Sequence, residues 1–310
     1  MRIAVNETNA GARLDAVVSK ACGVSLRQVR LWIDEGLVRI NEVQSGKAAA
    51  KGRRVVVGDL IDVVADLGPT APVLVAHPEV TVEVIYEDEH IVAINKPGPL
   101  PSHPLRAGEG ATAAAALVAR FPECATASID PREGGIGHRL DQGTSGVLVA
   151  ARSRVAWMAL REALGGTGCE KAYIAEVAGI MPISELCAEV IGRGGPKGGK
   201  GIVGGGKDPL PARTEFERIE TRSKSSLVRA RISSGRVHQV RAHASHLGFP
   251  VVGDAVYADD RSRRISAELG VTELHLHAES VRFRHPMTGQ PMKIVAPLPA
   301  WAEVTVKPSR

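Results

Sequence analysis

Apolar and polar residues alternate over much of the chain beyond residue 80, which is typical of strands that bury one face. This alternation predicts strands over 81–86, 91–94, 171–177, 227–232, 274–278 and 281–284. In the fourth of these, Val228 and Arg229 would point to opposite faces of a sheet. The uninterrupted apolar run 147–151 predicts a further, buried strand.

Two segments of the same region carry helix signals. Residues 111–120 are rich in alanine, the strongest helix former, and residues 237–247 end at Gly248, a residue type that commonly terminates helices. Residues 192–206 combine many glycines with three basic residues. We expect this stretch to be a mobile basic loop, because glycine-rich segments behave as flexible coils.

The first 66 residues follow a different pattern, with short helices ahead of a small β unit. Ser25 is a suitable N-cap for a helix with Leu26, Val29 and Ile33 on one apolar stripe, and Gly36 is placed to end it. Short strands are predicted over 37–41, 55–57 and 60–64. A Gly- and Pro-rich stretch over 67–79 then predicts a linker, so we expect domains at 1–66 and 80–310.

Composition narrows the class of protein. The chain has no apolar run long enough to span a membrane and no secretory signal at its start, so we expect a cytoplasmic protein. Its four cysteines are widely spaced, which argues against a zinc ribbon or a disulfide framework. The net charge of +5 is compatible with nucleic-acid binding without establishing it.

The most informative stretch runs from His138 to Gly146. It places Asp141 close to Arg139 on a glycine-punctuated turn that leads into the apolar run 147–151. Such a turn on a rigid scaffold can present a carboxylate to a substrate. The residues alone fit an inert surface turn with an ion pair equally well.

Region 1–66 carries a series of short motifs. They are Arg13-Leu14-Asp15, Ser25 with Arg27 and Arg30, Ile33 through Gly36, Val38 through Asn41, and Gly58-Asp59. In this order they resemble the S4 RNA-binding domain, although the residues alone also fit a small α+β domain with solvated charges. The resemblance implies contacts to the RNA backbone, which position a protein without selecting a sequence. The residues expected at the RNA are Arg13, Lys20, Arg27, Arg30, Lys47 and Lys51.

Four further segments occur in the order of one enzyme family. They are 95–97 with 102–104, 138–146, 171–175, and 234–241, the last continuing through Gly253-Asp254 to Tyr257. Together they resemble the pseudouridine synthases of the large-ribosomal-subunit type (the RluA/RluD family) over nearly the whole chain. The fold class that follows is α+β, with a small S4-like domain and a catalytic domain built on a mixed, mostly antiparallel sheet with flanking helices.

The resemblance implies that uridine in RNA is isomerised to pseudouridine without a cofactor. The bond between uracil N1 and ribose C1′ breaks, the base rotates, and C5 is joined to C1′. Asp141 matches the essential aspartate of the family, and an aspartate is ionised at pH 7. The resemblance leaves open whether the carboxylate adds covalently to the sugar or base, or removes a sugar proton to give a glycal.

Further residues match supporting roles, because a uridine stacked in folded RNA must be flipped out to react. Arg139 matches the residue that fills the vacated space, and Tyr173 matches the aromatic side chain that packs on the flipped base. Arg236 matches the basic residue that pairs with the catalytic aspartate. Val240 would line the base pocket, and Arg241 is a weaker candidate for supporting charge.

Other functions fit parts of the sequence. A non-catalytic RNA-binding or ribosome-assembly factor would also carry the S4-like region, but the presence of Asp141, Tyr173 and Arg236 speaks against it. A metal-dependent phosphodiesterase could use the histidines of 237–247, yet no acidic residue lies near them in sequence, so we expect no metal. We expect a monomer that acts on large-subunit ribosomal RNA rather than transfer RNA, by analogy with S4-bearing family members.

Overall fold

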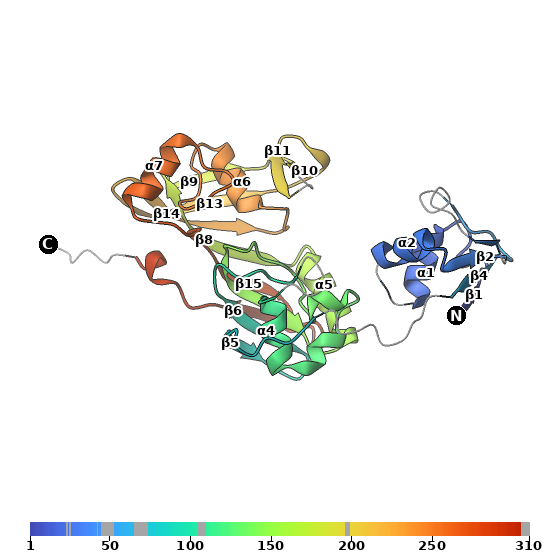
Figure 1. The fold of residues 1–310 in the computed structure, drawn as a ribbon. Coiled ribbons are helices and arrows are strands. Elements are labelled where there is room, and N and C mark those ends of the chain that lie inside the picture. The colour runs from blue at the N-terminus through green and yellow to red at the C-terminus, as the bar shows by residue number, and fades with distance from the viewer. Residues whose placement is uncertain are drawn as a thin grey trace. The chain divides into compact units, whose positions relative to one another are not determined.

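The computed structural model describes residues 1–22, 24, 26–41, 43–44, 53–64, 74–104, 110–195 and 199–304. The chain forms two compact units (Figure 1). The first comprises Met1–Val73 with Ile129–Pro131, and the second comprises Leu74–Ser128 with Arg132–Arg310. Each unit has its own hydrophobic core.

The first unit combines two packed helices with a four-stranded antiparallel sheet of order β1-β4-β2-β3 (Figure 1). Its elements are α1 (Leu14–Cys22), α2 (Leu26–Asp34), β1 (Arg2–Ala4), β2 (Val38–Ile40), β3 (Val43–Gln44) and β4 (Leu60–Val63). The predicted stripe of α2 is confirmed for Val29 and Ile33, which are buried, but not for Leu26, which is 42% exposed. Gly36 has the left-handed backbone, φ +73°, expected after the end of a helix. Ser25 lies outside the described residues.

The strand predicted over 55–57 is not formed. The neighbouring Arg54 makes an isolated bridge to Arg13, and Val55 is buried, but Val56 and Val57 are exposed. The cause is the turn at Gly58, whose φ is +91°. The chain turns there into β4, so among the described residues no second pair follows the bridge between Arg13 and Arg54.

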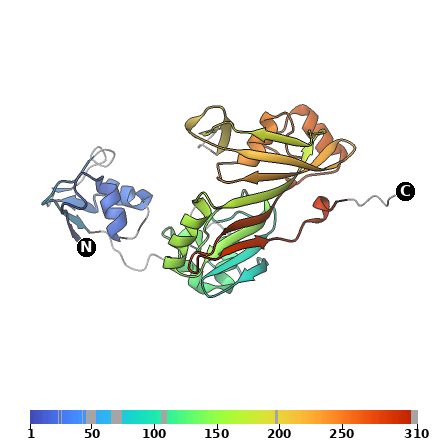
Figure 2. The ribbon, with the colours of Figure 1, turned by 180° about the vertical axis from the view of Figure 1, so that it is seen from behind.

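The second unit is built on a nine-stranded sheet (Figures 1 and 2). Its order is β5-β6-β7-β15-β8-β14-β13-β9, and β16 pairs with β15. Strands β7 and β15 pair in parallel, whereas their neighbours pair antiparallel, so the predicted mixed, mostly antiparallel α+β class is confirmed. The strands are β5 (Glu83–Glu87), β6 (Ile91–Lys96), β7 (Ser145–Ala151), β8 (Glu170–Ala178), β9 (Ser184–Cys187), β13 (Thr214–Thr221), β14 (Ser225–Ile232), β15 (Leu276–Arg284) and β16 (Pro291–Val295).

Helices α4 (Ala113–Arg120) and α5 (Arg154–Gly165) pack against alternate residues of β6 and β7. Within β7, Leu148 joins the core formed with α4, and Val147 joins the core formed with α5. Both faces of this strand are therefore covered, which explains its uninterrupted apolar sequence.

Helix α6 (Gln239–His246) packs on another part of the sheet, where Val240 and Ala244 meet apolar residues of β8 and β14. Gly248, with φ +83°, follows its end as predicted. The remaining helical segments are α7 (Asp260–Glu268), η1 (Pro122–Thr126), η2 (Pro131–Glu133) and η4 (Ala300–Ala302). Within the part of the chain that the structure describes, no helix combines the length and apolar character that a membrane crossing requires.

The expectation of a mobile loop at 192–206 is wrong for its described residues. They contribute to a small sheet of order β11-β10-β12, formed by β10 (Ile191–Gly194), β11 (Lys200–Val203) and β12 (Lys207–Leu210). The glycines permit a backbone approach that side chains would block. A Cβ on Gly192 would lie only 2.2 Å from the carbonyl oxygen of Gly205.

Candidate active site

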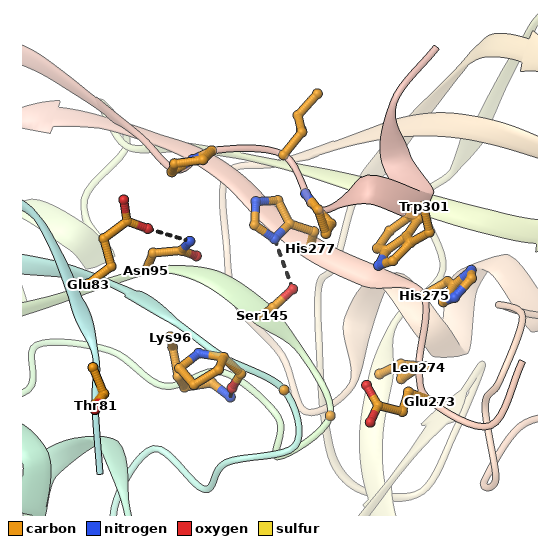
Figure 3. A pocket seen from close by; sticks show the side chains of 16 residues that line it. Thr81, Glu83, Asn95, Lys96, Ser145, Glu273, Leu274, His275, His277 and Trp301 are labelled. Carbon is orange, nitrogen blue, oxygen red and sulfur yellow. Dashed lines mark hydrogen bonds between the residues drawn. The ribbon is translucent and has the colours of Figure 1, made fainter. Parts of the chain in front are cut away.

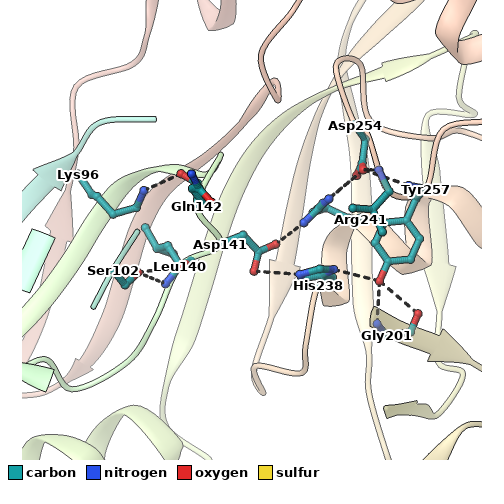
Figure 4. A network of polar contacts seen from close by, with 11 residues as sticks. Lys96, Ser102, Leu140, Asp141, Gln142, Gly201, His238, Arg241, Asp254 and Tyr257 are labelled. Carbon is teal, nitrogen blue, oxygen red and sulfur yellow. Dashed lines mark hydrogen bonds and ion pairs between the residues drawn. The ribbon is translucent and has the colours of Figure 1, made fainter. Parts of the chain in front are cut away.

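Asp141 lies on the loop that leads into β7, and hydrogen bonds fix this loop on both sides of it (Figure 4). Before it, the hydroxyl of Ser102 donates to the carbonyl oxygen of Leu140 at 2.8 Å and accepts from the Leu140 N–H at 3.0 Å. After it, the carbonyl oxygen of Gln142 accepts from Lys96 Nζ at 3.2 Å. The backbone of Asp141 is therefore held in place independently of its side chain.

Lys96 is fully buried at the end of β6 and ties two loops together. Besides Gln142, its ammonium group donates to the carbonyl oxygens of Pro97 at 3.0 Å and Leu100 at 2.6 Å. Burial lowers the pKa of Lys96 to about 8, while the charge of Asp141 acts in the opposite direction. Three carbonyl oxygens thus satisfy a buried cation that supports the loop of Asp141.

A pocket of about 560 Å³ borders the same loop at Gly143 and Ser145 (Figure 3). In this pocket the Ser145 hydroxyl lies 2.8 Å from Nδ1 of His277, and His275 stacks on Trp301 with ring centroids 4.5 Å apart. The contact between Ser145 and His277 joins the first residue of β7 to β15. It helps to determine where β7 begins, shortly after Asp141.

Gly146, the second residue of β7, has φ +106°, and a Cβ there would lie 2.2 Å from the carbonyl oxygen of Ala278. We expect Gly146→Ala to lower the free energy of unfolding by about 2 kcal/mol or more, measured by urea denaturation. Gly165→Ala is the matched control, because open space surrounds that glycine. Equal losses in both variants would contradict this steric explanation.

Arg241, on α6, bridges two carboxylates (Figure 4). Its Nη1 donates to Oδ2 of Asp141 at 2.8 Å, and its Nε and Nη2 donate to the two oxygens of Asp254 at 2.7 and 2.8 Å. The Asp254 side chain is completely buried, whereas that of Asp141 keeps 23% of its surface exposed. Arg241 therefore orients an accessible carboxylate by means of a buried one.

His238 borders the other oxygen of Asp141, and Tyr257 contacts the far side of its ring (Figure 4). Nε2 of His238 lies 3.8 Å from Oδ1 of Asp141, and its Nδ1 lies 3.2 Å from the Tyr257 hydroxyl. Burial lowers the pKa of His238 against the opposing charge of Asp141, so the ring is neutral at pH 7. Burial raises the pKa of Tyr257 to about 12, so its hydroxyl stays protonated.

A cleft of about 950 Å³ opens beside Asp141. Its apolar lining includes Tyr173, Val240 and Leu276, and positive charge comes from several arginines around them. An aromatic surface within a cationic cleft suits a ligand that carries both bases and phosphates. The arginines that line the cleft are Arg139, Arg161, Arg193, Arg236 and Arg241.

The structure brings the predicted residues of the second unit to this one cleft, although they come from separate segments. Arg139 is exposed, Val240 is buried, and Tyr173 is partly buried. Burial is the main cause that raises the pKa of Tyr173, and the charge of Asp141 raises it further, so its hydroxyl remains neutral. The aromatic ring and the carboxylate are thus available to the same ligand.

The predicted pairing of Arg236 with Asp141 is wrong. Nε of Arg236 donates instead to the carbonyl oxygen of Pro211 at 3.0 Å, and Arg241 takes the place of counter-ion. The reason is local geometry, because Arg236 precedes α6 whereas Arg241 lies on a buried face of that helix. Arg236 still contributes to the lining of the cleft.

In the first unit, two of the residues predicted to contact RNA also have a structural role. Arg13 and Arg30 pair with the buried carboxylate of Asp15 at 2.8 and 2.9 Å, yet their side chains keep 42% and 50% exposure. Lys20, in the last turn of α1, is exposed. Outside the described part of the chain lie Lys47, Lys51 and the side chain of Arg27.

The α6 histidine His243 serves the fold rather than a metal. It is buried, with Nδ1 2.8 Å from the Thr214 hydroxyl and Nε2 3.1 Å from the carbonyl oxygen of Glu189. In the described ranges, no group of three or more His, Cys, Asp or Glu side chains could hold a metal ion.

Sequence reasoning missed the parts that His238, Asp254 and Tyr257 take in the site. All three belong to the segment from Ser234 to Tyr257 that carried the resemblance, which is the signal that could have drawn attention to them. Their contacts with Asp141 and Arg241 depend on how loops fold around α6, which periodicity does not encode.

Comparisons with known proteins agree with this geometry. A family model described as RNA pseudouridylate synthase matches residues 90–246. An uncharacterized RNA pseudouridine synthase of Mycobacterium bovis is 33% identical over 94% of this chain and 92% of its own. The ribosomal large subunit pseudouridine synthase D of Vibrio vulnificus is 31% identical over 95% and 90%. The solved structure of human RNA pseudouridylate synthase domain containing 1 is 27% identical, with a TM-score of 0.56 over 71% of this chain and 84% of that one.

Proposed function

The chain belongs to the RNA pseudouridylate synthase family, and on that premise we propose that it modifies large-subunit ribosomal RNA with Asp141 as its catalytic carboxylate. The predicted family and the predicted activity, RNA pseudouridine synthase, are confirmed by these matches. The name of the Vibrio vulnificus relative supports the choice of RNA. The role of Asp141 rests on one observation, its orientation by Arg241 at the wall of the cationic cleft.

In this proposal, the flipped uridine enters the cleft with its uracil stacked on Tyr173 and its edge against Val240. Base–aromatic stacking contributes about 1–3 kcal/mol per base, which offsets the cost of unstacking the nucleotide. Arg139 is exposed and lies close to Asp141 in the sequence. Its side chain fills the space that the base leaves in the RNA. Because Arg241 engages Oδ2, the Oδ1 oxygen of Asp141 faces the nucleotide.

The activity and its RNA are tested by tritium release from RNA labelled at C5 of uridine. Large-subunit ribosomal RNA is compared with small-subunit ribosomal RNA and transfer RNA. Release from the large-subunit RNA alone supports the proposed target, and release from another RNA overturns it. Binding without release from any RNA would favour a non-catalytic ribosome-assembly factor. We also propose that the protein acts as a cytoplasmic monomer, which gel filtration and cell fractionation would test.

We further propose that the first unit acts as an S4-type RNA-binding domain. Support comes from the basic side chains of α1 and α2, namely the exposed Lys20 and the half-exposed Arg30. Arg30 and Arg13 are held by the buried Asp15, so their guanidinium groups have fixed positions. A fixed cation loses less side-chain entropy when it binds a phosphate.

The substitution Lys20→Ala is expected to weaken RNA binding equally for all RNA sequences, because a phosphate contact carries no sequence information. The slope of log K against log salt concentration should fall in magnitude by about 1, measured by filter binding. The control is Lys224→Ala, since Lys224 is already paired with Glu268 on the surface of the second unit. An unchanged salt slope in the Lys20 variant would count against an RNA contact at this residue.

A further inference from the structure

His238 is a titratable side chain of the cleft that has no task in the steps above. Its Nε2 lies 3.8 Å from Oδ1 of Asp141, whereas Arg241 bonds the opposite oxygen, Oδ2. The imidazole keeps 18% of its surface exposed and lines the same cleft as Tyr173. It therefore stands beside the atoms on which Asp141 would act.

The backbone holds His238 in this place at some energetic cost. Its φ is +53°, a left-handed conformation that is uncommon for residues other than glycine. The residue immediately precedes α6, and its two ring nitrogens face Tyr257 and Asp141 (Figure 4). Backbone strain of this kind persists where the surrounding structure fixes a functional side chain.

The Tyr257 hydroxyl connects His238 to β11. Its oxygen accepts the N–H of Gly201 in β11 at 2.8 Å, and the hydroxyl donates to the carbonyl oxygen of Gly201 at 3.2 Å. When the hydroxyl hydrogen lies on the Gly201 carbonyl, Nδ1 of His238 carries the ring hydrogen and donates it to the Tyr257 oxygen, 3.2 Å away; the role proposed below uses this tautomer. Nε2 then presents a lone pair toward Asp141, and two acceptors 3.8 Å apart leave room for a hydrogen of the substrate.

We propose that His238 is a catalytic base that removes the hydrogen from C5 of uracil. This proposal rests on the proposed function. Once C5 has bonded to C1′, it still carries its hydrogen, and N1 is doubly bonded to C6. Nε2 takes the C5 proton, the C5–H electron pair forms the C5–C6 double bond, and the C6–N1 pair moves to N1, which takes a proton from water.

The surroundings of His238 fit this step. The imidazolium that forms lies beside the carboxylate of Asp141, which stabilises the positive charge. In this proposal Tyr257, acting through His238, is a positioning residue, since its oxygen lies 3.2 Å from Nδ1 and accepts the hydrogen of that nitrogen. Because Tyr257 also bonds Gly201, the small β10–β11–β12 sheet supports the orientation of the base.

The test uses the full-length protein in single-turnover reactions on RNA that carries uridine or 5-deuterouridine. His238→Gln is expected to slow pseudouridine formation by about 10²-fold or more, the usual contribution of a general base. A primary deuterium isotope effect should appear in this variant and be weak in the wild type, since C5–H cleavage becomes the slow step. Tyr257→Phe should show a smaller loss with the same isotope effect.

The exposed His246, at the end of α6, gives the control His246→Gln, which should behave as the wild type. If His238→Gln slows both RNAs equally, its role is structural and the proposal is overturned. Wild-type rates in His238→Gln overturn it as well. A wild-type protein that forms no pseudouridine on any RNA would instead refute the proposed function, and the role of His238 with it.

Discussion

Asp141→Asn is expected to reduce pseudouridine formation by at least about 10³-fold while leaving folding and RNA binding intact. The amide has nearly the same shape as the carboxylate, and its oxygen can still accept from Arg241, 2.8 Å away in the wild type. What is lost is the negative charge, on which both nucleophilic attack and proton removal depend.

The measurement is tritium release under single-turnover conditions, with RNA binding followed separately by filter retention. Asp260→Asn is a suitable control, because Asp260 is a surface carboxylate, 92% exposed, that pairs with Arg263. We expect the control to retain wild-type activity. An Asp141→Asn variant that kept most of its activity, or one that no longer bound RNA, would contradict the role proposed for this carboxylate.

The strands can be predicted well where the alternation of apolar and polar residues within one segment is enough to define a strand. Strand β15 shows the limit, since its alternation predicts two strands, at 274–278 and 281–284, where the structure has one. The interruption falls at Glu279 and Ser280, and the register against β8 shifts between His277 and Ser280. Glu279 pairs with Arg229 at 2.8 Å, so a polar residue within the strand is stabilised by a partner far away in sequence.

Helix α5 was not predicted, although its signal was present in the sequence. Its buried residues Ala156, Trp157, Leu160 and Leu164 follow helical spacing, and Ser153 caps its start. The 192–206 stretch differs, because its glycines fit a flexible loop and a tight strand pair equally well. Only pairing between β10 and β11 decides between these two structures.

At the site, the motifs indicated which segments meet but not which arginine reaches Asp141. Helix α6 was predicted from residue 237, whereas it begins at Gln239 because His238 is left-handed. The left-handed His238 separates Arg236 from the helix, so helical spacing does not relate the direction of Arg236 to that of Arg241. Contact between Arg241 and Asp141, a hundred residues apart in sequence, follows from the whole fold.

Arg241→Met is accordingly expected to be far more destabilising than Arg236→Met. Removing Arg241 leaves the completely buried Asp254 and the partly buried Asp141 without their shared cation. Breaking a buried ion pair by removing one partner typically costs about 3–5 kcal/mol, to be measured as the free energy of unfolding in urea. Arg236→Met, whose guanidinium bonds a carbonyl oxygen, should cost about 1 kcal/mol or less.

The pH dependence of this loss identifies its cause. Burial alone would raise the pKa of Asp254, but the hydrogen bonds and charge of Arg241, aided by the backbone N–H groups of Val256 and Tyr257, outweigh burial and leave that pKa below its ordinary value. In the wild type, this carboxylate therefore contributes stability above the ordinary pKa, about 3.9, and the contribution is lost as the pH falls through the lower folded value. In Arg241→Met, the unpaired carboxylate should have a raised pKa, so the variant should become less stable, relative to the wild type, as the pH rises from mildly acidic to neutral. Adding Asp254→Asn should restore part of the stability at neutral pH. An equal loss of stability at mildly acidic and at neutral pH, or no recovery in the double variant, would show that lost packing rather than unpaired charge is responsible.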